Sequence, residues 1–142
     1  MNIAAILQSK GSDVVTVETG TLVREAVALL AGRRIGAVPV CDRGKVAGIM
    51  SERDIIYCLQ SDGAAILDWP VDRIMTAPAI TVERDKEIMS ALALMTQRRI
   101  RHLPVVDGDR IVGLVSIGDL VKYRMDEIEQ EAEAMLTYIQ SV

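Results

Sequence analysis

One short polar motif occurs twice in this chain, as Ser51-Glu52-Arg53-Asp54 and as Ser116-Ile117-Gly118-Asp119. Each copy follows an apolar run and precedes a helix-forming stretch. A serine before a helix with an acid three residues later is typical of a capping box, which stabilises a helix by about 1 kcal/mol and needs no ligand. The same pattern suits a nucleotide, because helix N–H groups can meet polar oxygens and the aspartate can accept hydrogen bonds from both ribose hydroxyls. Both interpretations stay open on the motif alone.

Cations gather just before Pro104 in the second half of the chain, at Arg98, Arg99, Arg101 and His102. A lone histidine on a strand is usually only a satisfied polar group, but like charges on one element are unfavourable without an anion. The first copy has Gly36 and Ala37 where the second has Arg101 and His102. We therefore expect two unequal sites, one cationic and suited to phosphate, the other roomy and dependent on main-chain contacts.

Both motifs lie in a duplicated segment that aligns without a gap from Thr16/Thr81 to Asp54/Asp119. In the first copy we expect a buried strand over 14–17, a helix capped by Thr21, a strand over 35–40, a turn over 42–44, a strand over 45–50 and a helix over 52–60. One such unit is too small to bury its own sheet face. The two copies should therefore pack on each other around a pseudo-two-fold axis.

Outside the duplication, residues 2–9 predict one or two helical turns, followed by a turn over 10–13. The final 23 residues contain neither Gly nor Pro, and apolar residues recur there at spacings of three and four: Met125, Ile128, Ala132, Met135, Ile139 and Val142. This predicts an amphipathic helix with a seam close to heptad spacing. It could pack on its own domain or form a dimer contact. A membrane surface is disfavoured because the polar face is acidic.

Composition narrows the function classes. The 142 residues are half hydrophobic, carry a net charge of −4 and include no Phe. This acidity argues against a nucleic-acid backbone as the main ligand. The apolar runs are too short to span a membrane, and no secretory signal is visible, so we expect a cytoplasmic protein. Cys41 and Cys58 lack zinc spacing and are expected to be free thiols.

The doubled strand–helix–strand–strand–helix unit, with Gly-h-h-Ser-x-x-Asp (h, hydrophobic) closing each copy, resembles a tandem pair of cystathionine β-synthase (CBS) domains. The resemblance covers essentially residues 2–123 and is closest to small bacterial proteins that contain a CBS pair and little else. It implies an α/β (α+β) fold of two βαββα repeats. We expect a first repeat over 1–60, a linker over 61–73 broken by Gly63 and Pro70, a second repeat over 74–123 and a C-terminal helix over 124–142.

The resemblance also implies ligands and site residues. CBS pairs bind AMP, ADP, ATP, S-adenosylmethionine or sometimes NAD(H) in two clefts between the copies. Asp54 and Asp119 match the ribose-binding acid, and Arg101 and His102 match phosphate contacts in the nucleotide-sensing subunit of AMP-activated protein kinase. Gly36 and Ala37 depart from that pattern, and Lys10 on the adjoining turn could compensate. One cleft would use Ile49, Ser51, Asp54, Thr76, Ile80, Ile100, Arg101, His102 and Pro104, and the other Leu114, Ser116, Asp119, Lys10, Ser12, Val15, Ile35, Gly36, Ala37 and Pro39.

We therefore expect a non-enzymatic regulatory module that senses adenine nucleotides and signals to an unknown effector protein in trans. AMP is the first ligand and NAD(H) the second, with ATP and S-adenosylmethionine as further candidates. The family resemblance implies a homodimer. The alternative is a dimeric scaffold protein whose clefts have no ligand-dependent role. An enzyme ranks third, because no nucleophile–base pair, metal set or Gly-rich phosphate loop is visible.

Overall fold

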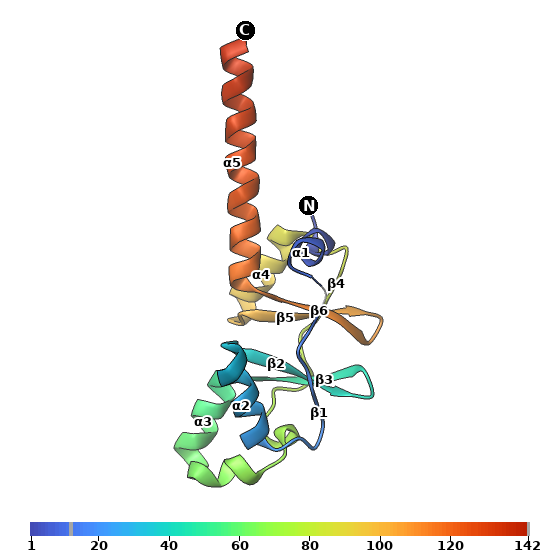
Figure 1. Ribbon diagram of the computed structural model, residues 1–142, viewed down its shortest axis with the longest axis vertical. Coiled ribbons are helices and arrows are strands. Elements are labelled where there is room, and N and C mark those ends of the chain that lie inside the picture. Colours follow the sequence, from blue (N-terminus) through green and yellow to red (C-terminus); the bar gives the residue numbers. More distant parts are fainter. Residues whose placement is uncertain (12, 142) are drawn as a thin grey trace.

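The computed structural model describes residues 1–11 and 13–141; Ser12, one of the expected site residues, lies outside them. Six strands form one sheet in the order β1-β2-β3-β6-β5-β4. Each repeat contributes its first, second and third strand in that order from one edge of the sheet to its centre, as expected for two copies related by a pseudo-two-fold axis (Figure 1). The strands are β1 (Val17–Glu18), β2 (Ala37–Asp42), β3 (Lys45–Ser51), β4 (Val82–Glu83), β5 (His102–Asp107) and β6 (Arg110–Ser116).

The helices follow the expected order. They are α1 (Ile3–Lys10), α2 (Val23–Arg33), α3 (Glu52–Asp62), α4 (Ile88–Arg98) and α5 (Ile117–Ser141), with two 3₁₀ helices, η1 (Gly63–Asp68) and η2 (Val71–Arg73), between the repeats. Both α2 and α4 end at an arginine in the left-handed region, Arg34 with φ 53° and Arg99 with φ 57°. That conformation turns the chain sharply into β2 and β5.

Three local expectations need correction. The strand expected over 14–17 pairs only at Val17 and Glu18, against Val40 and Cys41 of β2. The helix expected to be capped by Thr21 begins at Val23, and its N-cap Leu22 makes no side-chain cap. Thr21 instead uses its carbonyl to accept a hydrogen bond from the Val71 N–H. The strand expected over 35–40 begins two residues later, at Ala37.

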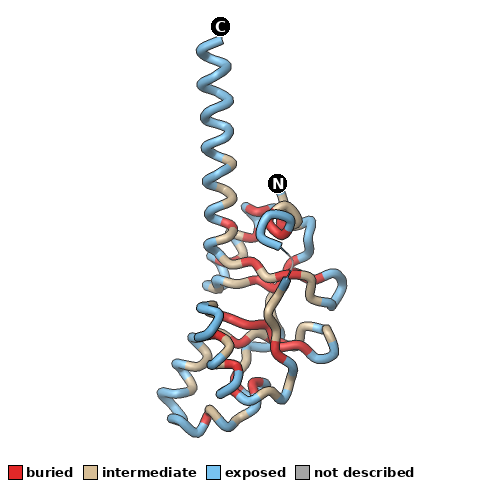
Figure 2. The backbone as a smooth tube through the Cα atoms, in the orientation of Figure 1, coloured by how far each residue is buried: buried red, intermediate tan, exposed pale blue. Residues whose placement is uncertain are grey.

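The two halves meet at the hairpin tips near the sheet centre. Lys45 of β3 pairs with Arg110 of β6, and the Lys45 ammonium lies 3.3 Å from the Asp109 carboxylate. Each half has its own aliphatic core, one around Val38 and Met50 and the other around Leu103 and Met95. Buried residues concentrate on the strands and their covering helices (Figure 2).

Two segments cross from one repeat to the other. Helix α1 packs in the core of the second half, where Ile3 is fully buried beside β6 and α5. The expected linker packs in the first half, where Ile66 and Val71 are fully buried. The domain bounds expected from the sequence remain predictions. This crossing matters for the site because it brings Lys10 to the second Ser-x-x-Asp motif and Thr76 to the first.

Helix α5 starts at the second motif and continues as one element to Ser141. Leu120 is its buried residue, and its C-terminal part extends away from the rest of the molecule (Figure 1). Packing on its own domain, one of the two expectations for this segment, therefore applies only to its first turns. Among the described residues, no helix is long and apolar enough to cross a membrane.

Candidate functional site

The first Ser-x-x-Asp motif forms a complete capping box at the start of α3. The Ser51 hydroxyl accepts a hydrogen bond from the Asp54 N–H at 3.3 Å, and Asp54 Oδ2 accepts from the Ser51 N–H at 2.9 Å. The other carboxylate oxygen, Oδ1, accepts from the Thr76 hydroxyl at 3.0 Å. Thr76 is held there by paired main-chain hydrogen bonds with Ile49. The capping interpretation is thus correct, and the side-chain partners of the Asp54 carboxylate are the neutral hydroxyls of Ser51 and Thr76.

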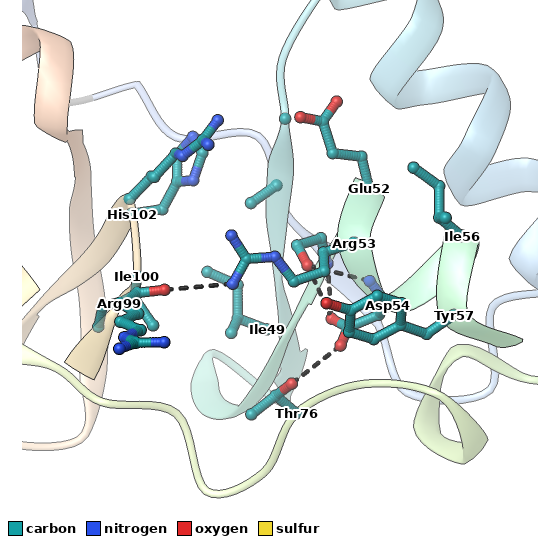
Figure 3. A pocket seen from close by; sticks show the side chains of 14 residues that line it. Ile49, Glu52, Arg53, Asp54, Ile56, Tyr57, Thr76, Arg99, Ile100 and His102 are labelled. Carbon is teal, nitrogen blue, oxygen red and sulfur yellow. Dashed lines mark hydrogen bonds between the residues drawn. The ribbon is translucent and has the colours of Figure 1, made fainter.

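Asp54 lies on the wall of a cavity of about 410 Å³, within the usual size range of small-molecule sites. The first half contributes the start of β2, the end of β3 and the first turns of α3, and the second half contributes the chain entering β5. Figure 3 shows Asp54, Thr76 and Tyr57 facing Ile100 and His102 across this space. The lining residues are Gly36, Ala37, Ile49, Ser51, Glu52, Arg53, Asp54, Ile56, Tyr57, Thr76, Arg99, Ile100, Arg101 and His102.

Cationic groups line the side of the cavity that belongs to the second half. Burial lowers the pKa of His102, followed by the charges of Lys10 and Arg101, and the carboxylates of Glu52 and Asp119 oppose that shift without reversing it. His102 is therefore largely neutral near pH 7 and would gain a proton beside an anion. Arg53 reaches across from α3 and donates to the Arg99 carbonyl at 3.2 Å. An anionic ligand would find Arg53, Arg101 and His102 on opposite faces of one cavity.

The second Ser-x-x-Asp motif has the same backbone cap but a charged partner. Asp119 Oδ2 accepts from the Ser116 N–H at 2.9 Å, as Asp54 does from Ser51. The same oxygen also accepts from the Lys10 ammonium at 2.7 Å, and that ammonium donates to the Leu114 carbonyl at 3.0 Å. Burial raises the pKa of Asp119, but the hydrogen bonds from Lys10 and Ser116 and the charge of Lys10 together hold it below its ordinary value.

Lys10 and Thr76 reach the two motifs from equivalent segments. Lys10 ends α1 and is not on a turn as the sequence suggested. The repeat spacing aligns Lys10 with Met75 and Gly11 with Thr76. A Cβ at Gly48 would approach Met75 and Thr76, and a Cβ at the equivalent Gly113 would approach Leu7, one helical turn before Lys10 in α1. The second motif therefore has a lysine ammonium where the first has a threonine hydroxyl.

The structure brings together most of the residues expected in the first cleft. Seven of the nine line the cavity: Ile49, Ser51, Asp54, Thr76, Ile100, Arg101 and His102. Ile80 instead packs on the core of the second half, and Pro104 pairs with Leu114 inside the sheet. Arg101 precedes β5, and His102 is its first residue.

The expected second cleft is brought together only in part. Lys10, Leu114, Ser116 and Asp119 meet as described above. Val15 packs on the first core, and Pro39 pairs with Ile49. Ile35 lines a separate cavity between α2 and α3, of about 550 Å³.

Gly36 and Ala37, which the sequence assigned to the second cleft, also contribute to the first. Both line the same cavity as Arg101 and His102. A Cβ at Gly36 would lie 3.3 Å from His102 Cε1 and 3.5 Å from Glu52 Oε1. The starts of β2 and β5 face each other near the pseudo-two-fold axis, so the small residues of one repeat leave space for Arg101 and His102 of the other. The two expected clefts therefore share this wall.

Four further lining residues carried no signal specific enough to be predicted: Glu52, Arg53, Ile56 and Tyr57. All four lie in the first two turns of α3, directly after the capping residue Ser51. Ile56 and Tyr57 are 61% and 66% exposed, which is unusual for large apolar side chains beside a cavity. Helical spacing from Asp54 could have suggested Tyr57, but not its orientation toward the other repeat.

Comparisons with known proteins agree with this architecture. A family model described as "CBS domain" matches residues 8–61 and again 71–126. The chain is 29% identical over 136 residues to the CBS domain-containing protein YhcV of Bacillus subtilis, covering 96% of this chain and 95% of that protein. The crystal structure of the CBS-domain containing protein ATU1752 from Agrobacterium tumefaciens matches with a TM-score of 0.83 and 38% identity, over 87% of this chain and 99% of that chain.

A second similar structure contains ligands. The CBS domain pair of protein MJ0100, in complex with 5′-methylthioadenosine and S-adenosyl-L-methionine, matches with a TM-score of 0.78 and 26% identity, over 89% of this chain and 98% of that chain. The duplicated unit, the palindromic sheet and both family-model matches together show that this chain is a tandem pair of CBS domains.

Proposed function

We propose that this chain is a regulatory module that binds adenosine-containing nucleotides, AMP first, in the cavity between its two CBS repeats. The observation that supports this most directly is the cavity of about 410 Å³ that has Asp54 on one wall and Arg101 and His102 on another. Its two walls offer a hydrogen-bond acceptor and cations at opposite ends of one space, which are the groups that a nucleoside phosphate needs.

Asp54 is the proposed ribose ligand. Its Oδ1 accepts from the Thr76 hydroxyl, a neutral group that a ribose hydroxyl can join or replace with little electrostatic cost. The phosphate would then lie toward Arg101 and His102. The base would lie against the apolar side chains of Ile49, Ile100 and Tyr57. In this arrangement one ligand contacts both repeats.

The phosphate of AMP distinguishes the proposed ligand from the ligands of one similar protein. The MJ0100 pair is named in complex with S-adenosyl-L-methionine and 5′-methylthioadenosine, which share the adenosine portion but carry no phosphate. Arg53, Arg101 and His102 favour a nucleotide over those two compounds at this cavity. NAD(H) ranks second, because one of its two nucleotide halves could bind in the cavity and the other in the second cleft beside Lys10. ATP follows, and S-adenosylmethionine is the weakest candidate.

The second cleft, built on Leu114, Ser116 and Asp119, is proposed as the weaker site. A ribose there must compete with the Lys10 ammonium for the Asp119 carboxylate. Lys10 could also turn to a phosphate, in which case Asp119 would lose its cation and gain a ribose. In both cases ligand binding breaks the ion pair between Lys10 and Asp119, whereas binding in the first cleft breaks no ion pair at Asp54.

The proposed output is a change in the angle between the two repeats. A ligand that bridges Asp54 and His102 stabilises whichever arrangement places these groups at the correct separation, and it shifts the population only as far as it prefers that arrangement. We propose that the module acts as a homodimer and passes this change to an effector protein in trans. The proposed role includes no catalytic step.

A thermal-shift series tests the proposal. AMP, ATP, NADH, S-adenosylmethionine and 5′-methylthioadenosine are added separately to the full chain, since a ligand that binds the folded state raises the unfolding midpoint by mass action. The proposal expects the largest shift with AMP and a smaller one with 5′-methylthioadenosine. No shift with any of the five compounds would contradict it and favour the alternative, a dimeric scaffold without a ligand-dependent role.

A further inference from the structure

Helix α5 exposes a long apolar face that its own chain does not cover. Its 25 residues extend about 37 Å at 1.5 Å per residue. Every described residue from Ile128 to Ser141 is exposed. Met135, Tyr138 and Ile139 are each more than 60% exposed, and Figure 2 shows this part of the tube coloured as exposed throughout. A helix in this position gains little from its own domain.

The apolar residues of α5 follow a strict heptad spacing. Their steps alternate between four and three residues, through Val121, Met125, Ile128, Ala132, Met135 and Ile139. This mean step of 3.5 residues keeps one seam on one side of two supercoiled helices, which is the pattern of a coiled coil. Met125, Ala132 and Ile139 then occupy a positions, and Val121, Ile128 and Met135 occupy d positions.

The charged residues beside the seam favour one partner and one orientation. Arg124 lies at a g position and Glu129 at the following e position, so a parallel, in-register pair places each Arg124 beside Glu129 of the other copy. An antiparallel pair with the same apolar layers would place Glu131 beside Glu131 and Glu129 beside Glu129, which is unfavourable. In the single chain, Arg124 lies 3.8 Å from both Glu127 and Glu131.

We propose that α5 forms a parallel, in-register, two-stranded coiled coil with α5 of a second copy of this chain. The partner is a second copy because the charge pattern is complementary to itself in this orientation. The helix begins directly after Ser116 and has Asp119 in its first turn, so the coiled coil would fix the position of the second Ser-x-x-Asp motif in both copies. This inference does not depend on nucleotide binding.

Disulfide cross-linking of the full chain tests the orientation. Met135→Cys places identical d residues opposite each other across a parallel seam, whereas in the antiparallel pair each would face an a position. The matched control is Gln130→Cys, an exposed f position on the outer side of the same helix. Both are made with Cys58→Ala, which leaves the buried Cys41 as the native thiol.

Under a mild oxidant, Met135→Cys should form a covalent dimer at least about tenfold faster than Gln130→Cys, because only the first pair of thiols is held at disulfide distance. Equal rates at the two positions, or no covalent dimer with Met135→Cys, would overturn the proposal.

A charge reversal gives a second test, in which the variant also carries Met135→Cys and the rate of disulfide cross-linking is measured. Glu129→Lys places a lysine beside Arg124 of the partner and should slow cross-linking by about threefold to tenfold at low salt. Glu133→Lys makes the same charge change at an outer b position and should leave the rate close to that of the parent. Equal effects of the two reversals would contradict the parallel register.

Discussion

The two Ser-x-x-Asp motifs have the same backbone and different chemistry. In both, the aspartate accepts the N–H of its serine at 2.9 Å and caps a helix. Asp54 then bonds the Thr76 hydroxyl, whereas Asp119 bonds the Lys10 ammonium. The duplication preserved the cap, which each repeat needs to start its helix, and left the third partner free to diverge. A carboxylate with a neutral partner can still recruit a ligand, and one paired with a cation is partly satisfied already.

The largest expected difference is in nucleotide affinity. Asp54→Ala should weaken AMP binding by about 2 kcal/mol, or about 30-fold, because it removes a charged acceptor from two ribose hydroxyls. Asp119→Ala should change the affinity of the tighter binding event by less than about threefold. Isothermal titration calorimetry of both variants beside the parent measures this, and the opposite ranking would reverse the assignment of the two clefts.

Gly48 and Gly113 occupy equivalent positions in β3 and β6, and they differ in what surrounds them. A Cβ at Gly48 would meet the Thr76 carbonyl oxygen at 2.7 Å, which is main chain and cannot yield without moving Thr76 away from Asp54. A Cβ at Gly113 would meet Leu7 Cδ2 at 2.6 Å, the end of a side chain that can rotate. Gly48→Ala should cost about 2–3 kcal/mol of unfolding free energy and weaken AMP binding, and Gly113→Ala about 1 kcal/mol. Urea unfolding gives both values, and equal costs would show that the surroundings of the two glycines are equally adaptable.

The pKa of His102 gives the cavity a pH dependence. Burial, with help from Lys10 and Arg101, lowers this pKa from its ordinary value of 6.5. A phosphate beside the ring would raise the pKa, so AMP binding should take up a proton and tighten by about threefold between pH 8 and pH 6.5. His102→Gln should remove most of this change. A variant that keeps the slope of the parent would show that another group is responsible.

The ion pair between Lys10 and Asp119 should contribute the smallest effect. The Lys10 side chain is 40% exposed, so solvent screening limits the pair to about 0.5 kcal/mol of stability. Because the pKa of Asp119 is below its ordinary 3.8 in the folded state, this contribution is present above that pH and is lost as the pH falls through the folded-state pKa. Lys10→Met should therefore lower stability at pH 7 and match the parent in strong acid. A deficit that persists in acid would indicate lost packing instead.

Local features of the site could be predicted from the residues themselves, whereas its non-local groupings came only from the family resemblance. The two capping boxes were visible because serine and aspartate lie three residues apart. The resemblance placed Lys10 and Asp119 in one cleft, but their ion pair joins residues 109 positions apart and depends on α1 crossing to the other half, so no local pattern predicts it. The additional place of Gly36 in the first cavity was not predicted, because the approach of Gly36 to His102 joins the two repeats and leaves no local pattern. The exposure of α5 was likewise open, since the same stripe could have covered its own domain.

A crystal structure of the full chain soaked with AMP tests the central claim most directly. The account predicts AMP in the cavity between the repeats, with both ribose hydroxyls on Asp54 and the phosphate beside Arg101 and His102. At the lowest AMP concentration that fills this cavity, the Lys10 ammonium should remain on Asp119. AMP bound with its ribose on Asp119 while the cavity at Asp54 stays empty would contradict the account.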